Sequence, residues 1–137
     1  MIRAVIDTNV LVSGLLSPAG NEALIVLAIH QGLIRPCFSE AMTQEYAEVL
    51  ARPKFGFEPD TIAAVLEMVR DNGELIVPRT FARDLHDPDD AKFVDCAETA
   101  QAEYLVTGNK RHFPPEACGT VRVVSAGELL DRITLEI

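Results

Sequence analysis

The feature that most constrains the fold is a short apolar run, residues 2–6, that ends in an aspartate. The run, Ile-Arg-Ala-Val-Ile, is rich in β-branched residues and is typical of a strand buried inside a sheet. Asp7 follows it directly, and the small polar residues Thr8 and Asn9 suit the start of a helix. Open α/β sheets bind ligands beyond the carboxyl ends of their strands. Asp7 is therefore either a ligand-binding carboxylate or the cap of the helix that follows.

Strand-like and helix-like segments alternate along the chain. The predicted strands cover residues 2–6, 33–38, 74–77, 104–107 and 120–124. The predicted helices cover residues 8–16, 21–31, 39–52, 59–72 and 87–102, and a last helix follows Ser125. Pro36 indicates an edge position or a strand end for the second strand, and Gly32 ends the helix before it. This alternation predicts an α/β protein with a mostly parallel sheet covered by helices on both faces.

Length and composition are those of one globular domain. The chain has 137 residues, of which 48% are hydrophobic and 24% charged, enough for a single core. No apolar run reaches the roughly 18 residues of a membrane span, and the N-terminal stretch lacks the pattern of a secretory signal. The cysteines, Cys37, Cys96 and Cys118, form no Cys-x-x-Cys pair. We expect one domain over residues 1–137, reduced thiols, no membrane contact and a cytoplasmic location.

The formal net charge of −9 would normally disfavour a nucleic-acid partner, because an acidic surface repels phosphate groups. A cluster of carboxylates neutralised by a bound cation would remove this objection where the cation sits. The charge therefore leaves a nucleic-acid substrate open.

A glutamate lies at the edge of the apolar stripe of the predicted helix 39–52. Glu45 follows Met42 by three residues and precedes Val49 by four, so it faces partly inward. A carboxylate in such a position is costly unless it is paired or binds a metal. Glu45 is thus a candidate ligand, with an ordinary glutamate at the edge of an amphipathic helix as the alternative.

The run Asp-Pro-Asp-Asp at 87–90 opens the next predicted helix. Asp87 as a cap, proline at the first position and Asp89 in the first turn are all explained by helix capping and the helix dipole. Asp90 differs, because it lies three residues before Phe93, on the face that packs against the sheet. Asp90 is therefore the member of the run that we expect in a functional site.

The segment 106–113 leads from a predicted strand through a glycine turn into basic residues. Asn109 follows the turn, and Lys110, Arg111 and His112 come directly after it. Asn109 could be a turn residue, and the basic side chains could be ordinary surface charge. As the C-terminal end of a strand, the segment is also a candidate part of the site that contains Asp7.

These polar residues are expected to converge at one end of the sheet. Asp7 and Asn109 follow strands, Asp90 starts a helix, and Glu45 lies on a helix beside the sheet. Carboxylates brought together without a cation repel one another and raise each other's pKa values. Oxygen ligands favour Mg²⁺ or Mn²⁺ over zinc, and the sequence shows no competing cysteine or histidine cluster.

Four segments in this order resemble the PIN-domain family, and most closely its short, single-domain bacterial and archaeal members assigned as toxins of type II toxin–antitoxin systems. They are I-D-T-N-V-L-V-S at 6–13, S-E-A-M-T-Q-E-Y-A-E-V-L-A-R-P-K-F at 39–55, D-P-D-D-A-K-F-V-D-C-A at 87–97 and Y-L-V-T-G-N at 104–109. Each segment is weakly specific alone, whereas the ordered set spans nearly the whole chain. The chain is thus similar to a PIN domain throughout.

The resemblance implies a three-layer α/β/α sandwich with a mostly parallel four- to five-stranded sheet and a metal-dependent ribonuclease site. The family's first three acidic residues fall on Asp7, Glu45 and Asp90. Its fourth acid falls on Asn109, a neutral ligand, and a further acid sometimes found two residues later is replaced by Arg111. Three carboxylates and an amide can hold one Mg²⁺ with waters, whereas a second ion would be held poorly. Asp87, Asp89 and Asp95 are the acids that could compensate, and Asp95 is the weaker candidate because it lies five residues after Asp90 on the helix.

The activity that the resemblance implies is hydrolysis of RNA phosphodiester bonds by an endoribonuclease that uses Mg²⁺ or Mn²⁺. Asp7 and Asp90 would bind the metal directly, while Glu45 and Asn109 would bind it or orient its water. The candidate substrate contacts are Thr8, Asn9, Arg52, Lys54, Lys110, Arg111 and His112. Ordinary surface charge is the alternative for the basic residues among them. A cognate antitoxin and a homodimer are further expectations from the resemblance.

Three other functions are weighed against this one. A phosphatase with an N-terminal aspartate nucleophile usually has a second aspartate two residues later, where this chain has Asn9. A phospho-accepting receiver domain needs an aspartate after its third strand, where Pro78 stands. The strongest rival is a weak or inactive PIN-like domain that binds RNA or a partner protein, which Asn109 and the net charge favour.

Overall fold

The computed structural model describes the backbone of residues 1–136 and the side chains of residues 1–134. Its strands are β1 (Ile2–Ile6), β2 (Ile34–Phe38), β3 (Glu74–Leu75), β4 (Tyr104–Val106) and β5 (Arg122–Val124). Its helices are α1 (Thr8–Leu16), α2 (Asn21–His30), α3 (Glu40–Leu50), α4 (Pro59–Asn72), α5 (Ala91–Ala100) and α6 (Ala126–Glu136). Short 3₁₀ turns are η1 (Pro53–Phe55), η2 (Pro88–Asp90), η3 (Lys110–His112) and η4 (Pro115–Ala117).

The five strands form one parallel sheet in the order β3-β2-β1-β4-β5, which confirms the predicted mostly parallel sheet. The chain moves from β1 to β2 on one side and later returns to β4 on the other, so the strand order reverses at β1. The crevice at such a reversal is where open α/β sheets bind ligands. The register pairs Ile6 with Val106, so the next residues, Asp7 and Thr107, lie side by side at this crevice.

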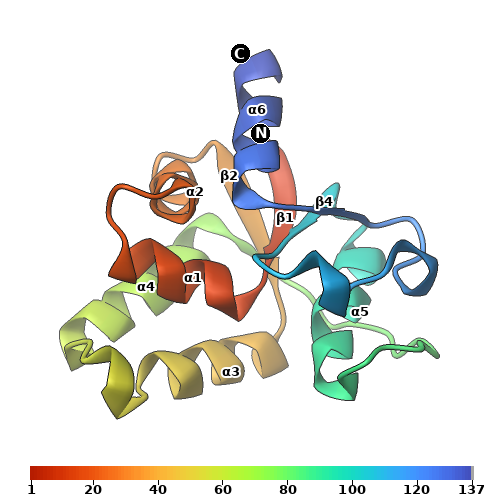
Figure 1. Cartoon of the computed structure of the whole chain (residues 1–137), viewed down its shortest axis with the longest axis horizontal. Coiled ribbons are helices and arrows are strands. Elements are labelled where there is room, and N and C mark those ends of the chain that lie inside the picture. Colours follow the sequence, from red (N-terminus) through yellow and green to blue (C-terminus); the bar gives the residue numbers. More distant parts are fainter. Residues whose placement is uncertain (137) are drawn as a thin grey trace.

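Helices cover both faces of the sheet, as the sequence predicts (Figure 1). Helix α5 packs against β1, β2 and β4 on one face, while α2 and α4 pack against β2 on the other. Helix α1 packs beside α2, and α6 extends past it toward the opposite end of the molecule from α3. Helix α3 lies across the end of the sheet where β1 terminates and contacts both α1 and α5.

The core fixes the central strands and attaches α3 to them. Val5, Ile6 and Leu105 are essentially inaccessible to solvent, as continuous apolar strands inside a covered parallel sheet should be. Tyr46 of α3 is buried among them, and its hydroxyl donates a hydrogen bond to the carbonyl oxygen of Ile6. This bond fixes α3 at the strand end directly before Asp7, which determines where Glu45 can reach.

Several local predictions are confirmed and others need correction. Gly32 takes the left-handed conformation (φ 78°) that ends α2, as predicted. The prediction of an edge position or a strand end from Pro36 is wrong, because β2 is flanked by β1 and β3 and Pro36 is its middle residue. Strand β3 pairs only with Cys37 and Phe38, so the proline lies beside a stretch that β3 does not reach. The predicted helix 87–102 starts later, at Ala91, because η2 forms its first turn.

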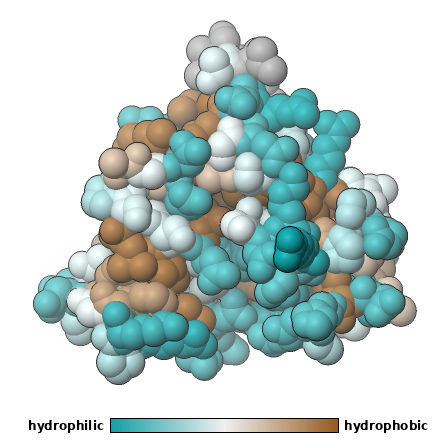
Figure 2. Space-filling view, in the orientation of Figure 1, coloured by the Kyte–Doolittle hydropathy of each residue, from teal (hydrophilic) through white to brown (hydrophobic). Residues whose placement is uncertain are grey.

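The surface around α1 and α2 carries exposed apolar side chains. Leu16, Leu24 and Leu27 are each about half exposed. In Figure 2, apolar surface gathers on the left of the view, where Figure 1 places these two helices. Within the described residues no single helix is long and apolar enough to cross a membrane; α1 and α2 meet that test only as a pair, which is bent by 104°.

Candidate active site

Asp7 lies buried at the carboxyl end of the central strand, with 7% of its surface exposed. It occupies the position before the first residue of α1, yet within the described part of the chain its side chain makes no capping hydrogen bond. Its Oδ2 instead accepts a hydrogen bond from the Thr107 hydroxyl at 2.8 Å. The hydrogen bond that holds the Asp7 side chain therefore comes from the neighbouring strand end, and Asp7 does not form the usual side-chain cap of α1.

Thr107 joins the ends of β1 and β4, and sequence reasoning missed it. While its Oγ1 donates to Asp7, the same oxygen accepts the backbone N–H of Asn109 at 3.0 Å. Asn109 is thus attached to the site through its backbone. Only the order of strands in the sheet brings Thr107 beside Asp7, so a reading of either segment by itself gives no signal for the contact.

Glu45 reaches the site from α3 and is fully engaged. Its Oε2 accepts a hydrogen bond from the Thr8 hydroxyl, and its Oε1 accepts one from Nζ of Lys92 at 2.7 Å. Lys92 also contacts Oδ2 of Asp89 at 3.2 Å. The inward-facing glutamate is therefore paired, as its burial requires, and the sequence analysis did not identify the lysine that pairs with it.

Asp90 enters from the start of α5 and lacks a full set of partners. Its side chain is 17% exposed, and its buried Oδ2 has no hydrogen-bond partner among the described residues. Nδ1 of His112 lies 3.2 Å from this oxygen, an ion-pair distance, but not in hydrogen-bonding geometry. A buried carboxylate oxygen without a donor is costly in a stable fold. It is the kind of atom that a bound cation would satisfy.

The charges of these carboxylates affect one another. Burial, followed by the negative charges of Asp7 and Asp87, raises the pKa of Asp90 to about 6, while His112 opposes the rise. Burial also raises the pKa of Asp7, against the hydrogen bond from Thr107, and the charge of Glu45 adds to the rise. Desolvation and repulsion between carboxylates are the signature of a site that lacks a positive charge.

The side chains at the site offer oxygen donors of the type that a hard divalent cation prefers. Among the described residues, no three Asp, Glu, His or Cys side chains are grouped closely enough to share an ion. Both oxygens of Glu45 are turned to other partners, Thr8 and Lys92. Asp7 and Asp90 are the carboxylates that remain, and the orphaned oxygen of Asp90 fits a cation that prefers oxygen ligands.

A family model described as PIN domain matches residues 3–111, well over half of the chain. The chain belongs to the PIN domain family. One solved structure with the same fold is the crystal structure of VapBC2 from Rickettsia felis, bound to a DNA fragment from the VapBC2 promoter. One chain of it matches with a TM-score of 0.61 and 13% sequence identity, over 90% of this chain and 98% of that chain. No curated protein matches the sequence. The family predicted from the four segments is thereby confirmed.

The other acidic residues of the PIN domain have partners that explain them. Asp87 precedes η2, and its side chain accepts the backbone N–H of Asp89 at 3.0 Å, which is the predicted capping role. Asp95 points away from the site to Arg83, whose Nε lies 2.9 Å from its Oδ1. The candidate site of this PIN domain therefore centres on Asp7, Glu45 and Asp90.

The candidate substrate contacts fall into different surroundings. Thr8 is buried against Glu45, and His112 lies beside Asp90, so both are within the site. Arg52 lines a groove of about 280 Å³ that also borders Glu45 and Lys92. The remaining candidates lie outside these contacts: Asn9 and Arg111 are exposed, Lys54 lies over the Phe55 ring, and Lys110 pairs with Glu128.

Replacing Thr107 by valine is expected to weaken Mn²⁺ binding by about 10- to 100-fold, because the substitution removes the hydrogen bond that orients Asp7. Thr107→Ser keeps the hydroxyl and should restore most of the affinity. Calorimetric titration of both variants measures the effect. Wild-type affinity in the valine variant, together with a loss in the serine variant, would show that packing of the threonine methyl group matters, and not the hydrogen bond.

Proposed function

We propose that this PIN domain is an Mg²⁺- or Mn²⁺-dependent endoribonuclease that hydrolyses RNA phosphodiester bonds. The observation that carries the proposal is the buried carboxylate of Asp7, at the end of the strand where the strand order reverses, together with the partly buried carboxylate of Asp90. One of these carboxylates has a buried oxygen without a donor. Membership of the PIN domain family supports the same chemistry.

Each residue of the site has a distinct task in this proposal. Asp7 and Asp90 hold the cation, and Thr107 keeps Asp7 oriented through its hydroxyl. Glu45 and Asn109 bind the cation or orient the attacking water. When bound, the divalent cation supplies a lower pKa for that water and stabilises the negative charge on the departing oxygen.

The substrate is proposed to approach along the groove beside α3. Arg52 lies on this groove together with Glu45 and Lys92. Thr8 and His112 lie within the site, where they can contact the phosphate group next to the scissile bond. Contacts to phosphate groups position the RNA without reading its sequence.

We further propose that the chain is the toxin of a cytoplasmic toxin–antitoxin pair and forms a homodimer. The solved structure of VapBC2, which shares the fold, is a complex bound to promoter DNA. The exposed leucines Leu16, Leu24 and Leu27 provide apolar surface to which a protein partner can bind. Cys37, Cys96 and Cys118 are all free and buried, in keeping with a reducing compartment.

A second candidate function is an inactive PIN domain that binds RNA or a protein without cleavage. Two observations favour it: an amide at position 109 and the engagement of both Glu45 oxygens by other side chains. Both reduce the negative charge available to a metal.

The deciding experiment incubates the purified protein with labelled structured and single-stranded RNA in Mn²⁺, in Mg²⁺ or in EDTA. We expect cleavage in the presence of either metal and none in EDTA. Asp7→Asn should abolish cleavage, whereas Asp60→Asn, which removes the same charge from the exposed start of α4, should cleave like the wild type. RNA binding without cleavage in any metal would favour the second candidate function.

Asn109→Asp is expected to tighten Mn²⁺ binding, since it adds a charged ligand at the position of the family's fourth acid. The gain should be about tenfold, typical of a further charge near a bound ion. Calorimetric titration with Mn²⁺ measures it, and Asn21→Asp, at the start of α2, provides the matched control. An unchanged affinity would mean that residue 109 does not face the metal.

A further inference from the structure

Lys92 is the one lysine of the described chain with its ammonium group in the candidate site. Lys92 lies on α5, two residues after Asp90, and its side chain is only 19% exposed. Nζ lies 2.7 Å from Oε1 of Glu45 and 3.2 Å from Oδ2 of Asp89. It also lies 5.8 Å from the ring centre of Phe93. An ordered, half-buried ammonium group between two carboxylates acts there as a fixed positive charge.

The ammonium group of Lys92 lowers the negative charge that the site offers to cations. Asp7, Glu45 and Asp90 provide three negative charges, and Lys92 pairs with one of these carboxylates, Glu45, as well as with the exposed Asp89. A second ion would need additional carboxylates. Position 109 is an amide and position 111 an arginine, so this part of the chain supplies none.

The hydrogen bonds lead to the same result. A second metal beside Glu45 would have to bind the carboxylate oxygen that Lys92 now contacts, and the other oxygen is occupied by the Thr8 hydroxyl. Asp89, which lines the same groove as Glu45, is held by the same ammonium group. The ammonium group of Lys92 therefore lies where a second cation would bind, and it already pairs with the carboxylates that such a cation would need.

We propose that Lys92 substitutes for a second metal ion, so that the site binds one divalent cation. The proposal rests on the proposed function, because it takes Asp7 and Asp90 to be the ligands of that cation. It assigns Lys92 as a residue that determines metal stoichiometry. It also gives a role to the lysine within the segment D-P-D-D-A-K-F that the capping residues and the metal ligands leave unexplained.

The test counts Mn²⁺ ions per chain by isothermal titration calorimetry, independently of RNA cleavage. We expect one ion for the wild type and about two for Lys92→Met, which keeps the side-chain length but removes the charge. Lys92→Arg keeps the charge and should bind one ion. Arg132→Met, which removes an exposed charge from α6, is the matched control and should also bind one.

The outcomes separate this proposal from the proposed function. One ion in the wild type and one in Lys92→Met, whatever the affinity, overturns the role of Lys92 and leaves the proposed function standing. Two ions in the wild type also overturn it, and no ion in the wild type overturns both. Far-UV circular dichroism confirms that each variant is folded, with Lys92→Gln as the second neutral variant. Anomalous diffraction from Mn²⁺-soaked wild-type crystals counts the ions without any substitution, and one peak is expected.

Discussion

Asp90→Asn is expected to abolish RNA cleavage and, at the same time, to make the metal-free protein more stable. The wild-type carboxylate is partly buried, has a buried oxygen without a donor among the described residues, and is repelled by Asp7 and Asp87. Its pKa rises from 3.8 to about 6, which at 1.36 kcal/mol per pKa unit corresponds to about 1–3 kcal/mol of destabilisation at neutral pH. Asparagine has a similar shape and no charge, so it removes this penalty.

The sign of the pH dependence follows from the raised pKa. Well below pH 4 the carboxyl group is neutral in both the folded and the unfolded chain, and the wild type carries no penalty. As the pH rises from about 4 through about 6, the unfolded chain ionises first and the folded chain must then hold an unfavourable charge, so stability is lost over this range. The advantage of Asp90→Asn over the wild type should therefore be small at pH 4 and largest at pH 7.

Thermal unfolding in EDTA at both pH values measures this difference, and we expect several degrees at pH 7. Added Mn²⁺ should raise the melting temperature of the wild type but not that of Asp90→Asn. Cleavage by the variant should fall by more than about 100-fold, since a proposed metal ligand is lost. Asp60→Asn provides the control for a change in net charge. A variant less stable than the wild type in EDTA at pH 7 would show that Asp90 supports the fold.

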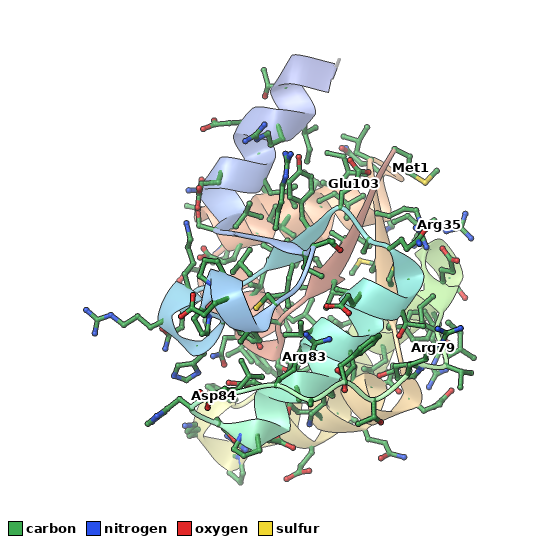
Figure 3. The ribbon with its side chains drawn as sticks, turned by 90° about the vertical axis from the view of Figure 1, so that its right-hand side faces the viewer. Met1, Arg35, Arg79, Arg83, Asp84 and Glu103 are labelled. Atoms are coloured by element: carbon green, nitrogen blue, oxygen red, sulfur yellow. The ribbon has the colours of Figure 1, made fainter. Side chains whose placement is uncertain are left out.

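Arg83→Met is expected to lower the free energy of unfolding by about 3–5 kcal/mol, the usual cost of removing one partner from a buried ion pair. The Arg83 side chain is only 4% exposed. It binds Asp95 at 2.9 Å and Glu98 at 3.2 Å on α5, and it donates to the carbonyl oxygen of Ala117 at 2.9 Å. Figure 3 shows the segment from Arg79 to Asp84 crossing α5, with Arg83 turned toward the helix.

Urea unfolding followed by circular dichroism measures this change. Arg79→Met, in the same segment but exposed, is the control and should change stability by less than about 0.5 kcal/mol. Asp95→Asn in the Arg83→Met background should recover part of the loss, because it removes the carboxylate left buried without its partner. Equal stability of Arg83→Met and the wild type would mean that packing of the segment holds it on α5 without the ion pairs.

The sequence predicts the fold well because the fold depends on local patterns. The β-branched runs and the helix-ending glycine at position 32 each act within a few residues of themselves. Ser39 accepts the backbone N–H of Met42 at 3.3 Å, as a cap should. The strand order and the position of Pro36 are less predictable, since they depend on which strands become neighbours.

The candidate site is predictable in its carboxylates and not in what surrounds them. Asp7, Glu45 and Asp90 are conspicuous because acids are unusual on faces that pack inward. Thr107 and Lys92 act through contacts between segments about 100 and 47 residues apart, and neither residue type is unusual where it occurs. The sequence therefore identifies the candidate ligands, while only the structure identifies the groups that orient and neutralise them.

The hydrogen bond between Thr107 and the backbone of residue 109 has a consequence for how such a site can change over time. The threonine holds the amide group that every residue except proline provides, so the loop after β4 keeps its course whichever side chain stands there. The side chain at 109 can then exchange an acid for an amide without loss of the fold. A single nucleotide change can thus alter the charge offered to a metal. Activity can therefore change in evolution through a substitution at this position alone.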